Sequence, residues 1–169
     1  MSPIFDHEWR EKIIASFEAD REDTLDELKQ ILSFPFHPDT RLVMFELHGN
    51  GGVFGLNPWP MKDGDYHIDI DASGTPLYQT GFDEFGCGFS AYDQLDEVNR
   101  MSPEEIGDLD DLAIDYLCDW FADLLHELNA DLPISYAIQR HDYTGVYSVP
   151  EKEWLTDAEF DSRFEDGEG

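Results

Sequence analysis

The chain has 169 residues, of which 39 are acidic and 10 basic, giving a net charge of −29 at pH 7. Apolar residues make up 41% of the sequence, which is enough for a folded domain with a buried core despite the charge. A charge this negative repels phosphates and anionic membrane surfaces, so it argues against direct nucleic-acid or membrane binding and favours basic partners.

The sequence shows no targeting or metal-binding motif. The first residues lack the basic and apolar regions of a signal peptide, and no apolar run approaches the roughly 18 residues of a membrane span. Cys87 and Cys118 have neither metal-type nor redox-type spacing. We therefore expect a soluble cytoplasmic protein with two free thiols, no cofactor and no metal.

The N-terminal part is predicted to be helical and then to enter a sheet. Residues 6–33 place apolar side chains on one helical face, and dilution of this stripe indicates a break near Asp20. Residues 41–48 have the pattern of a central strand. The glycines at 49–52 then predict a hairpin turn into a return strand over 53–56.

The next segment is predicted to complete an antiparallel meander. The prolines in Asn57-Pro-Trp-Pro60 are expected to break the sheet. Strict alternation over 66–71 predicts a third strand, and 76–80 its partner. Residues 81–92, rich in glycine and phenylalanine, are interpreted as an aromatic loop packed on the core.

The stretch from Ser102 to Pro133 predicts one long amphipathic helix, the most distinctive feature of the chain. Ser102 is the expected N-cap, Pro103 takes the first helical position, and Glu105 completes a capping box. Apolar residues recur at spacings of three and four, and carboxylates recur every fourth residue on another face: Asp111, Asp115, Asp119, Asp123 and Glu127. Like charges four apart repel by about 0.2–0.5 kcal/mol per pair, so helix stability does not explain this row. Binding to a cationic partner would explain the row.

The remaining elements set the fold class. Strands are predicted at 134–138 and 146–149, then a short helix capped by Thr156, and a frayed tail at 165–169. The order predicts a single α+β domain over residues 1–169, with an antiparallel sheet of about five to six strands. The long helix and the N-terminal helix are expected to pack on it.

Known site motifs are weak in this chain. The glycines at 49–55 are followed by a proline-rich stretch, which forbids the helix that a phosphate loop requires. Asp69-Ile-Asp-Ala-Ser-Gly74 starts like a calcium loop, but its twelfth position is Thr80 instead of glutamate. No zinc or nucleophile motif is present. The sequence therefore favours a protein that is not an enzyme.

In size, acidity and α+β pattern, the chain resembles the small acidic immunity proteins of bacterial toxin systems. The Asn50-Gly-Gly52 turn and the aspartate-rich segment at 66–80 are similar to the SUKH group of these proteins. The resemblance implies a cytoplasmic inhibitor that blocks a basic cognate toxin, often a nuclease. The partner-binding residues predicted from the sequence are the five carboxylates together with Trp59, Phe82 and Phe85.

Three alternatives stay open at this point. The carboxylates of the row lie about 6 Å apart along the helix axis, similar to neighbouring phosphates, so a DNA mimic is one. An enzyme or metal-binding protein using His48, His67 and nearby aspartates is another. The third is that the acidity serves only solubility or adaptation to salt, with the row as a solvated face.

Overall fold

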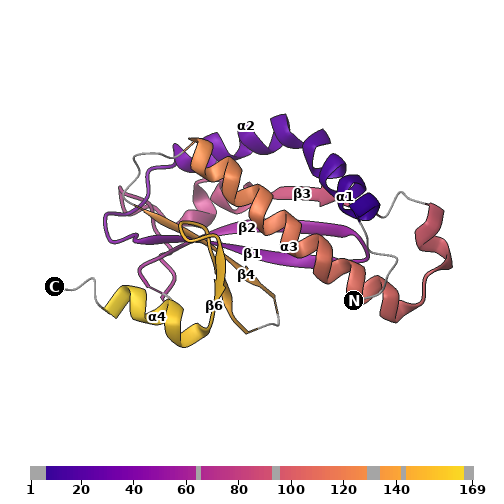
Figure 1. Ribbon diagram of the computed structural model, residues 1–169. Helices are drawn as coiled ribbons and strands as arrows, with labels where there is room; N and C mark the ends of the chain where they lie inside the picture. The colour runs from indigo at the N-terminus through magenta and orange to yellow at the C-terminus, as the bar shows by residue number, and fades with distance from the viewer. Residues whose placement is uncertain (1–6, 64–65, 93–95, 129–133, 142–143, 166–169) are drawn as a thin grey trace.

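The computed structural model describes residues 7–63, 66–92, 96–128, 134–141 and 144–165 (Figure 1). Within these ranges the chain forms four α-helices and one six-stranded sheet, which confirms the predicted α+β class. The helices are α1 (His7–Ala19), α2 (Arg21–Leu32), α3 (Pro103–Leu128) and α4 (Asp157–Glu165). The strands are β1 (Leu42–Asn50), β2 (Val53–Met61), β3 (Cys87–Ser90), β4 (Ser135–Arg140), β5 (Val146–Ser148) and β6 (Glu153–Leu155).

The strands are arranged in the order β3-β2-β1-β4-β5-β6, so β1 is central, as predicted. Four of the five neighbouring pairs are antiparallel, and β1 with β4 is parallel. A parallel pair needs a crossover connection, and α3 lies in the chain between β1 and β4. The long helix is therefore the element that carries the chain back across the sheet (Figure 1).

The two faces of the sheet are covered unequally. On one face, α1, α2 and α3 bury the main core, to which β1 contributes Val43, Phe45 and Leu47 (Figure 1). On the other face, a smaller cluster includes Leu42 and Met44 and is capped by Phe160 of α4. Because α4 is short, the second face has no helical cover of comparable length.

Several local predictions are confirmed. The N-terminal helix breaks at Asp20. Ser102 and Glu105 form a reciprocal capping box at the start of α3. The turn between β1 and β2 depends on Gly49, whose φ is +110° and whose added Cβ would lie 2.2 Å from the Val53 carbonyl oxygen. Only glycine fits there.

The predicted meander over 41–80 is wrong in its second half. Residues 66–71 and 76–80 form only isolated bridges, and Leu77–Gln79 is a 3-10 turn, η1. The third strand is instead β3, in the segment predicted to be a loop. Alternation alone misled the prediction: the side chain of Tyr66, expected inside, is 67% exposed, whereas Cys87 and Phe89 of β3 are buried against the helices.

The prolines of Asn57-Pro-Trp-Pro60 do not break the sheet. Pro58 and Pro60 both belong to β2 and lie opposite Phe45 and Val43 of β1. The carbonyl of Pro60 accepts a hydrogen bond from Ile68 on the side away from β1. The absent proline N–H groups thus face the edge that β3 does not cover, where no ladder bond is lost.

Other differences concern the C-terminal part. Strand β6 was not predicted, and it pairs with β5. Thr156 and Glu159 form the predicted cap of α4, whose last residue is Glu165. The expected end of the long helix at Asn129 and Pro133, and residues 166–169 of the predicted tail, lie outside the described residues.

Candidate functional site

The five carboxylates predicted as a binding row, hereafter the acidic row, lie on the exposed side of α3. Each one contacts a side chain from another element. The contacts are Asp111 with Arg140 at 2.8 Å, Asp115 with Trp154, Asp119 with the Tyr147 hydroxyl, Asp123 with Lys152 at 2.6 Å, and Glu127 with Arg21 at 2.6 Å. The row is therefore bonded within the chain along its whole length.

These contacts explain why like charges are tolerated at four-residue spacing. Four of the five partners come from the β4–β6 part of the chain, so the row attaches α3 to this part of the sheet. Three partners are cations, which leaves two net negative charges among five carboxylates and their partners. Partial burial raises the pKa of Asp115, and the neighbouring charges of Asp111 and Asp119 raise it further.

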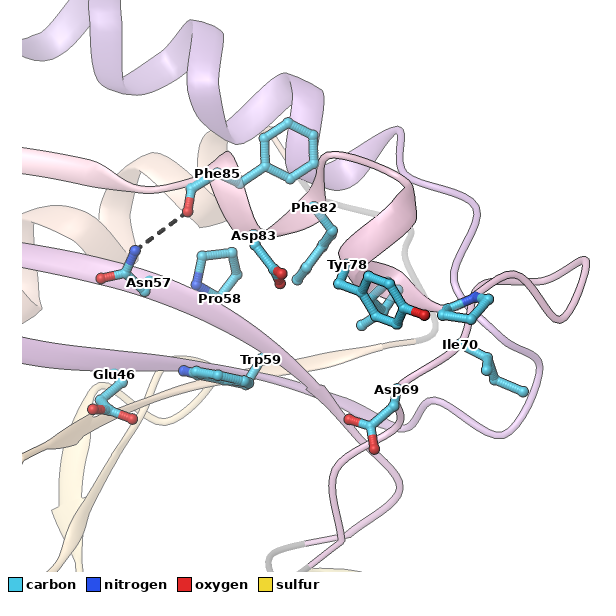
Figure 2. A pocket seen from close by; sticks show the side chains of 12 residues that line it. Glu46, Asn57, Pro58, Trp59, Asp69, Ile70, Tyr78, Phe82, Asp83 and Phe85 are labelled. Carbon is cyan, nitrogen blue, oxygen red and sulfur yellow. Dashed lines mark hydrogen bonds between the residues drawn. The ribbon is translucent and has the colours of Figure 1, made fainter.

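A groove of about 670 Å³ lies elsewhere, beside β2. Its lining includes Glu46 of β1, Asn57, Pro58 and Trp59 of β2, and Asp69 and Ile70 of the following loop. The 3-10 turns η1 (Leu77–Gln79) and η2 (Phe82–Glu84), with Pro76 and Phe85, complete it. Figure 2 shows Trp59 and Glu46 on one side and Asp83, Phe82 and Tyr78 on the other. Roughly 300–1,000 Å³ is typical of ligand-binding clefts.

Buried apolar side chains form the floor of the groove. Phe82 and Leu77 are buried, and Phe82 packs against Phe34 with ring centroids 4.7 Å apart. Phe85 packs on Phe82 at 5.4 Å. Because Phe34 lies two residues after the end of α2, this aromatic cluster fixes η2 against the helical layer.

Hydrogen bonds hold the rim in place. The Asn57 amide donates to the Phe85 carbonyl at 3.3 Å (Figure 2). The next residue, Gly86, donates its N–H to the Glu27 carboxylate at 2.8 Å. In the loop that carries Asp69, the Asp71 carboxylate accepts bonds from Ser73 and Thr75, which keeps its pKa below the usual range. In the segment that starts like a calcium loop, Asp71 therefore shapes a turn.

Exposed aromatic side chains form the walls. Tyr78 is 73% exposed and Trp59 is 39% exposed, although both are large and partly apolar. The Trp59 ring stacks on His67, with centroids 5.2 Å apart and planes 22° apart. Tyrosine and tryptophan in such positions are the residue types most enriched at the centres of protein interfaces.

Three carboxylates stand around this aromatic surface: Glu46, Asp69 and Asp83. Glu46 lies 3.2 Å from His141. The carboxylates of Asp69 and Asp83 make no side-chain hydrogen bond or ion pair within the described residues, and both residues are exposed. The groove thus differs from the acidic row, because its aspartates remain available to a ligand.

The predicted partner-binding residues lie on two different surfaces, and the sequence had left open whether the acidic helix face or the aromatic residues form the interface. Trp59, Phe82 and Phe85 do line one groove, with Phe82 as floor and Trp59 as wall. The acidic row contacts the β4–β6 part of the sheet instead. Sequence reasoning missed Tyr78 and Asp83, and it had no local signal for them, since η1 and η2 meet Trp59 only through the tertiary fold.

The histidines of the alternative metal hypothesis have other contacts. His48 is hydrogen-bonded to Asn57, and His67 stacks on Trp59. Among the residues that the structure describes, no group of three or more His, Cys, Asp or Glu side chains is arranged to hold a metal ion. The same residues include no helix long and apolar enough to cross a membrane.

No protein-family model, curated protein or solved structure was found to match the chain.

Proposed function

We propose that this protein is a non-enzymatic inhibitor that binds a basic protein partner through the groove beside β2. The observation that carries the proposal is the combination of exposed Trp59 and Tyr78 with the available carboxylates of Asp69 and Asp83. Aromatic side chains in a groove supply most of the binding energy of an interface, and flanking charges select the partner.

The charge of the whole chain supports the same partner class. A net charge of −29 speeds the approach of a cationic protein and slows that of an anionic one. The class we propose is a bacterial toxin with a basic active site, nucleases included, which the inhibitor would cover as an immunity protein does. The toxin class rests on the acidity and the resemblance in size and pattern.

A DNA mimic has less support. Such a protein needs unpaired carboxylates at phosphate-like spacing, and the acidic row is the longest series with that spacing among the described residues of α3. Ion pairs with Arg21, Arg140 and Lys152 reduce the charge that the row presents. We therefore place the partner surface in the groove.

The proposal is tested by differential capture from the native lysate at low salt. The immobilised wild-type chain is compared with an Asp69→Asn/Asp83→Asn variant, and bound protein is released by salt. The matched control is Glu22→Gln/Asp26→Asn, which removes two charges from exposed positions of α2. All three retained fractions are identified and assayed for an activity that the free wild-type chain inhibits.

We expect a basic protein that the wild type and the control retain and the groove variant loses. Addition of the wild-type chain should inhibit its activity. Absence of any basic protein in the salt eluate of the wild type would overturn the proposal. Equal retention by the groove variant would overturn the groove as the partner surface.

A further inference from the structure

We propose that the groove recognises an arginine side chain of the partner, with the guanidinium stacked on Trp59 and bonded by Asp69 and Asp83. This inference rests on the proposed function and names the group that the groove takes. Its elements are an exposed aromatic ring, two carboxylates with no other partner in the described residues, and a buried apolar floor.

The Trp59 ring is suited to a planar cation. A guanidinium lies flat on an indole face, and the attraction is worth about 0.5–1 kcal/mol at exposed sites and more when desolvated. His67 stacks on Trp59, and 39% of the residue stays exposed beside the groove. The chain makes contacts of this kind elsewhere, since Arg41 lies 5.4 Å from the centroid of the Phe164 ring and Arg10 lies 5.6 Å from that of Tyr116.

The two groove carboxylates are also suited to a guanidinium. Asp69 comes from the loop after β2, and Asp83 comes from η2, so the two aspartates approach the groove from different segments (Figure 2). A guanidinium has five N–H donors in one plane and can bond carboxylates while its face is stacked. A lysine ammonium can also lie over an indole ring, as Lys12 does at 5.4 Å from the Trp9 centroid while paired with Glu8 and Glu97. It has no flat face to stack and is more strongly hydrated, so it fits this arrangement less well than a guanidinium.

The groove is poorly suited to an uncharged occupant. An apolar side chain on Trp59 and Tyr78 would take water from Asp69 and Asp83 without replacing it. Partly desolvated carboxylates without a partner are unfavourable. An arginine offers an aliphatic stem for the apolar floor of Leu77 and Phe82 and a charged end for the rim.

The test is an NMR titration of the ¹⁵N-labelled full chain. The probes are N-acetyl-arginine amide, N-acetyl-lysine amide and N-acetyl-citrulline amide, in which the charged guanidinium is replaced by a neutral urea of nearly the same shape. The readout is the indole N–H signal of Trp59, assigned with a Trp59→Phe variant. The chain contains four tryptophans, and the other three report on non-specific effects.

We expect the arginine probe to shift the Trp59 signal selectively, and to bind about fivefold more tightly than the lysine probe. The citrulline probe should produce no saturable shift of the Trp59 signal. Asp69→Asn/Asp83→Asn should weaken arginine binding by about tenfold through the loss of charge-assisted hydrogen bonds, and Glu22→Gln/Asp26→Asn should not.

Equal shifts from the three probes, or no shift of Trp59 by arginine, would overturn the inference. Such a result leaves the proposed function standing if capture still depends on the groove aspartates. Arginine binding at Trp59 without any captured basic protein would support the inference and refute the proposed inhibitor. The two failures are thereby distinguishable.

Discussion

The carboxylate of Asp110 on α3 accepts hydrogen bonds from the backbone N–H groups of Gly51 and Gly52, at 2.9 and 3.0 Å. Asp110 is only 7% exposed, and the Tyr92 hydroxyl donates to the same carboxylate. One buried charge thus ties the long helix to the turn between β1 and β2. Asp110 is adjacent to the acidic row but has a different role, because its partners are backbone donors of the turn.

Replacing Asp110 should therefore destabilise the fold. Asp110→Ala leaves the two N–H groups and the Tyr92 hydroxyl without their acceptor, and we expect the free energy of unfolding to fall by about 3 kcal/mol. Urea denaturation measures it. The control is Asp108→Ala on the same helix, an exposed position where the change should stay within about 0.5 kcal/mol. Equal effects from both substitutions would contradict this role.

Replacing Asp115, in contrast, should stabilise the fold. Burial raises its pKa in the folded chain, with the charges of Asp111 and Asp119 as additional causes. A raised pKa means that ionised Asp115 opposes folding at neutral pH. Asp115→Asn removes this charge and keeps an oxygen for Trp154. We expect a gain of about 0.5 kcal/mol at pH 7, because the charge is no longer partly buried and its repulsion by Asp111 and Asp119 is lost.

The raised pKa of Asp115 also predicts how its effect on stability depends on pH. The unfavourable contribution of Asp115 is absent below the ordinary aspartate pKa, where the side chain is neutral in both states, and it appears as pH rises through the raised folded-state pKa. The stability difference between Asp115→Asn and wild type should therefore be present at pH 7 and vanish near pH 3. Thermal unfolding at both pH values measures it, and a difference that grows on acidification would refute the assignment.

Removing the hydrogen bond from the Tyr147 hydroxyl to Asp119 should cause a moderate loss of stability. Tyr147→Phe removes the donor, and a hydrogen bond to a charged group that is partly solvated contributes about 1–2 kcal/mol. Tyr66→Phe is the matched control, because Tyr66 is highly exposed. Denaturation midpoints for the two variants make the comparison. A Tyr147→Phe variant as stable as the control would show that this bond does not hold α3 to β5.

The floor and the walls of the groove should respond differently to truncation. Phe82→Ala removes a buried ring from the aromatic cluster and should lower stability by about 3–5 kcal/mol. Tyr78→Ala removes an exposed ring and should change stability by less than about 1 kcal/mol. Partner binding should nonetheless weaken in the Tyr78 variant. Denaturation together with binding assays separates the two roles.

Features of the fold that depend on residues close in sequence could be predicted, and features that depend on residues far apart in sequence could not. Helix starts at Ser102 and Thr156 were predictable, since a capping box involves residues three apart. Strand β3 was not, because its pairing with Val53–Leu56 and its burial under α1 are tertiary. Residues 66–71 show the converse, an alternating pattern without a sheet to bury it.

The candidate site shows the same limit. The acidic row was visible in the sequence, but its partners Arg140, Tyr147 and Lys152 lie 29, 28 and 29 residues away from the carboxylates they contact. A periodic charge pattern therefore suggested unpaired carboxylates, whereas the fold pairs them with side chains from other elements. Trp59 was predicted as a partner-binding residue and lies in the groove lining, whereas the position of Asp83 in the same lining depended on how η2 folds back.

The central claim is that the groove, and not the acidic row, contacts the basic partner. The most direct measurement is the dissociation constant of the captured partner for two variants that lose the same charge, Asp69→Asn/Asp83→Asn and Asp111→Asn/Asp123→Asn. We predict that the groove variant binds at least about tenfold more weakly than wild type, and that the row variant stays within about threefold. A tenfold loss in the row variant, with the groove variant unchanged, would contradict the account.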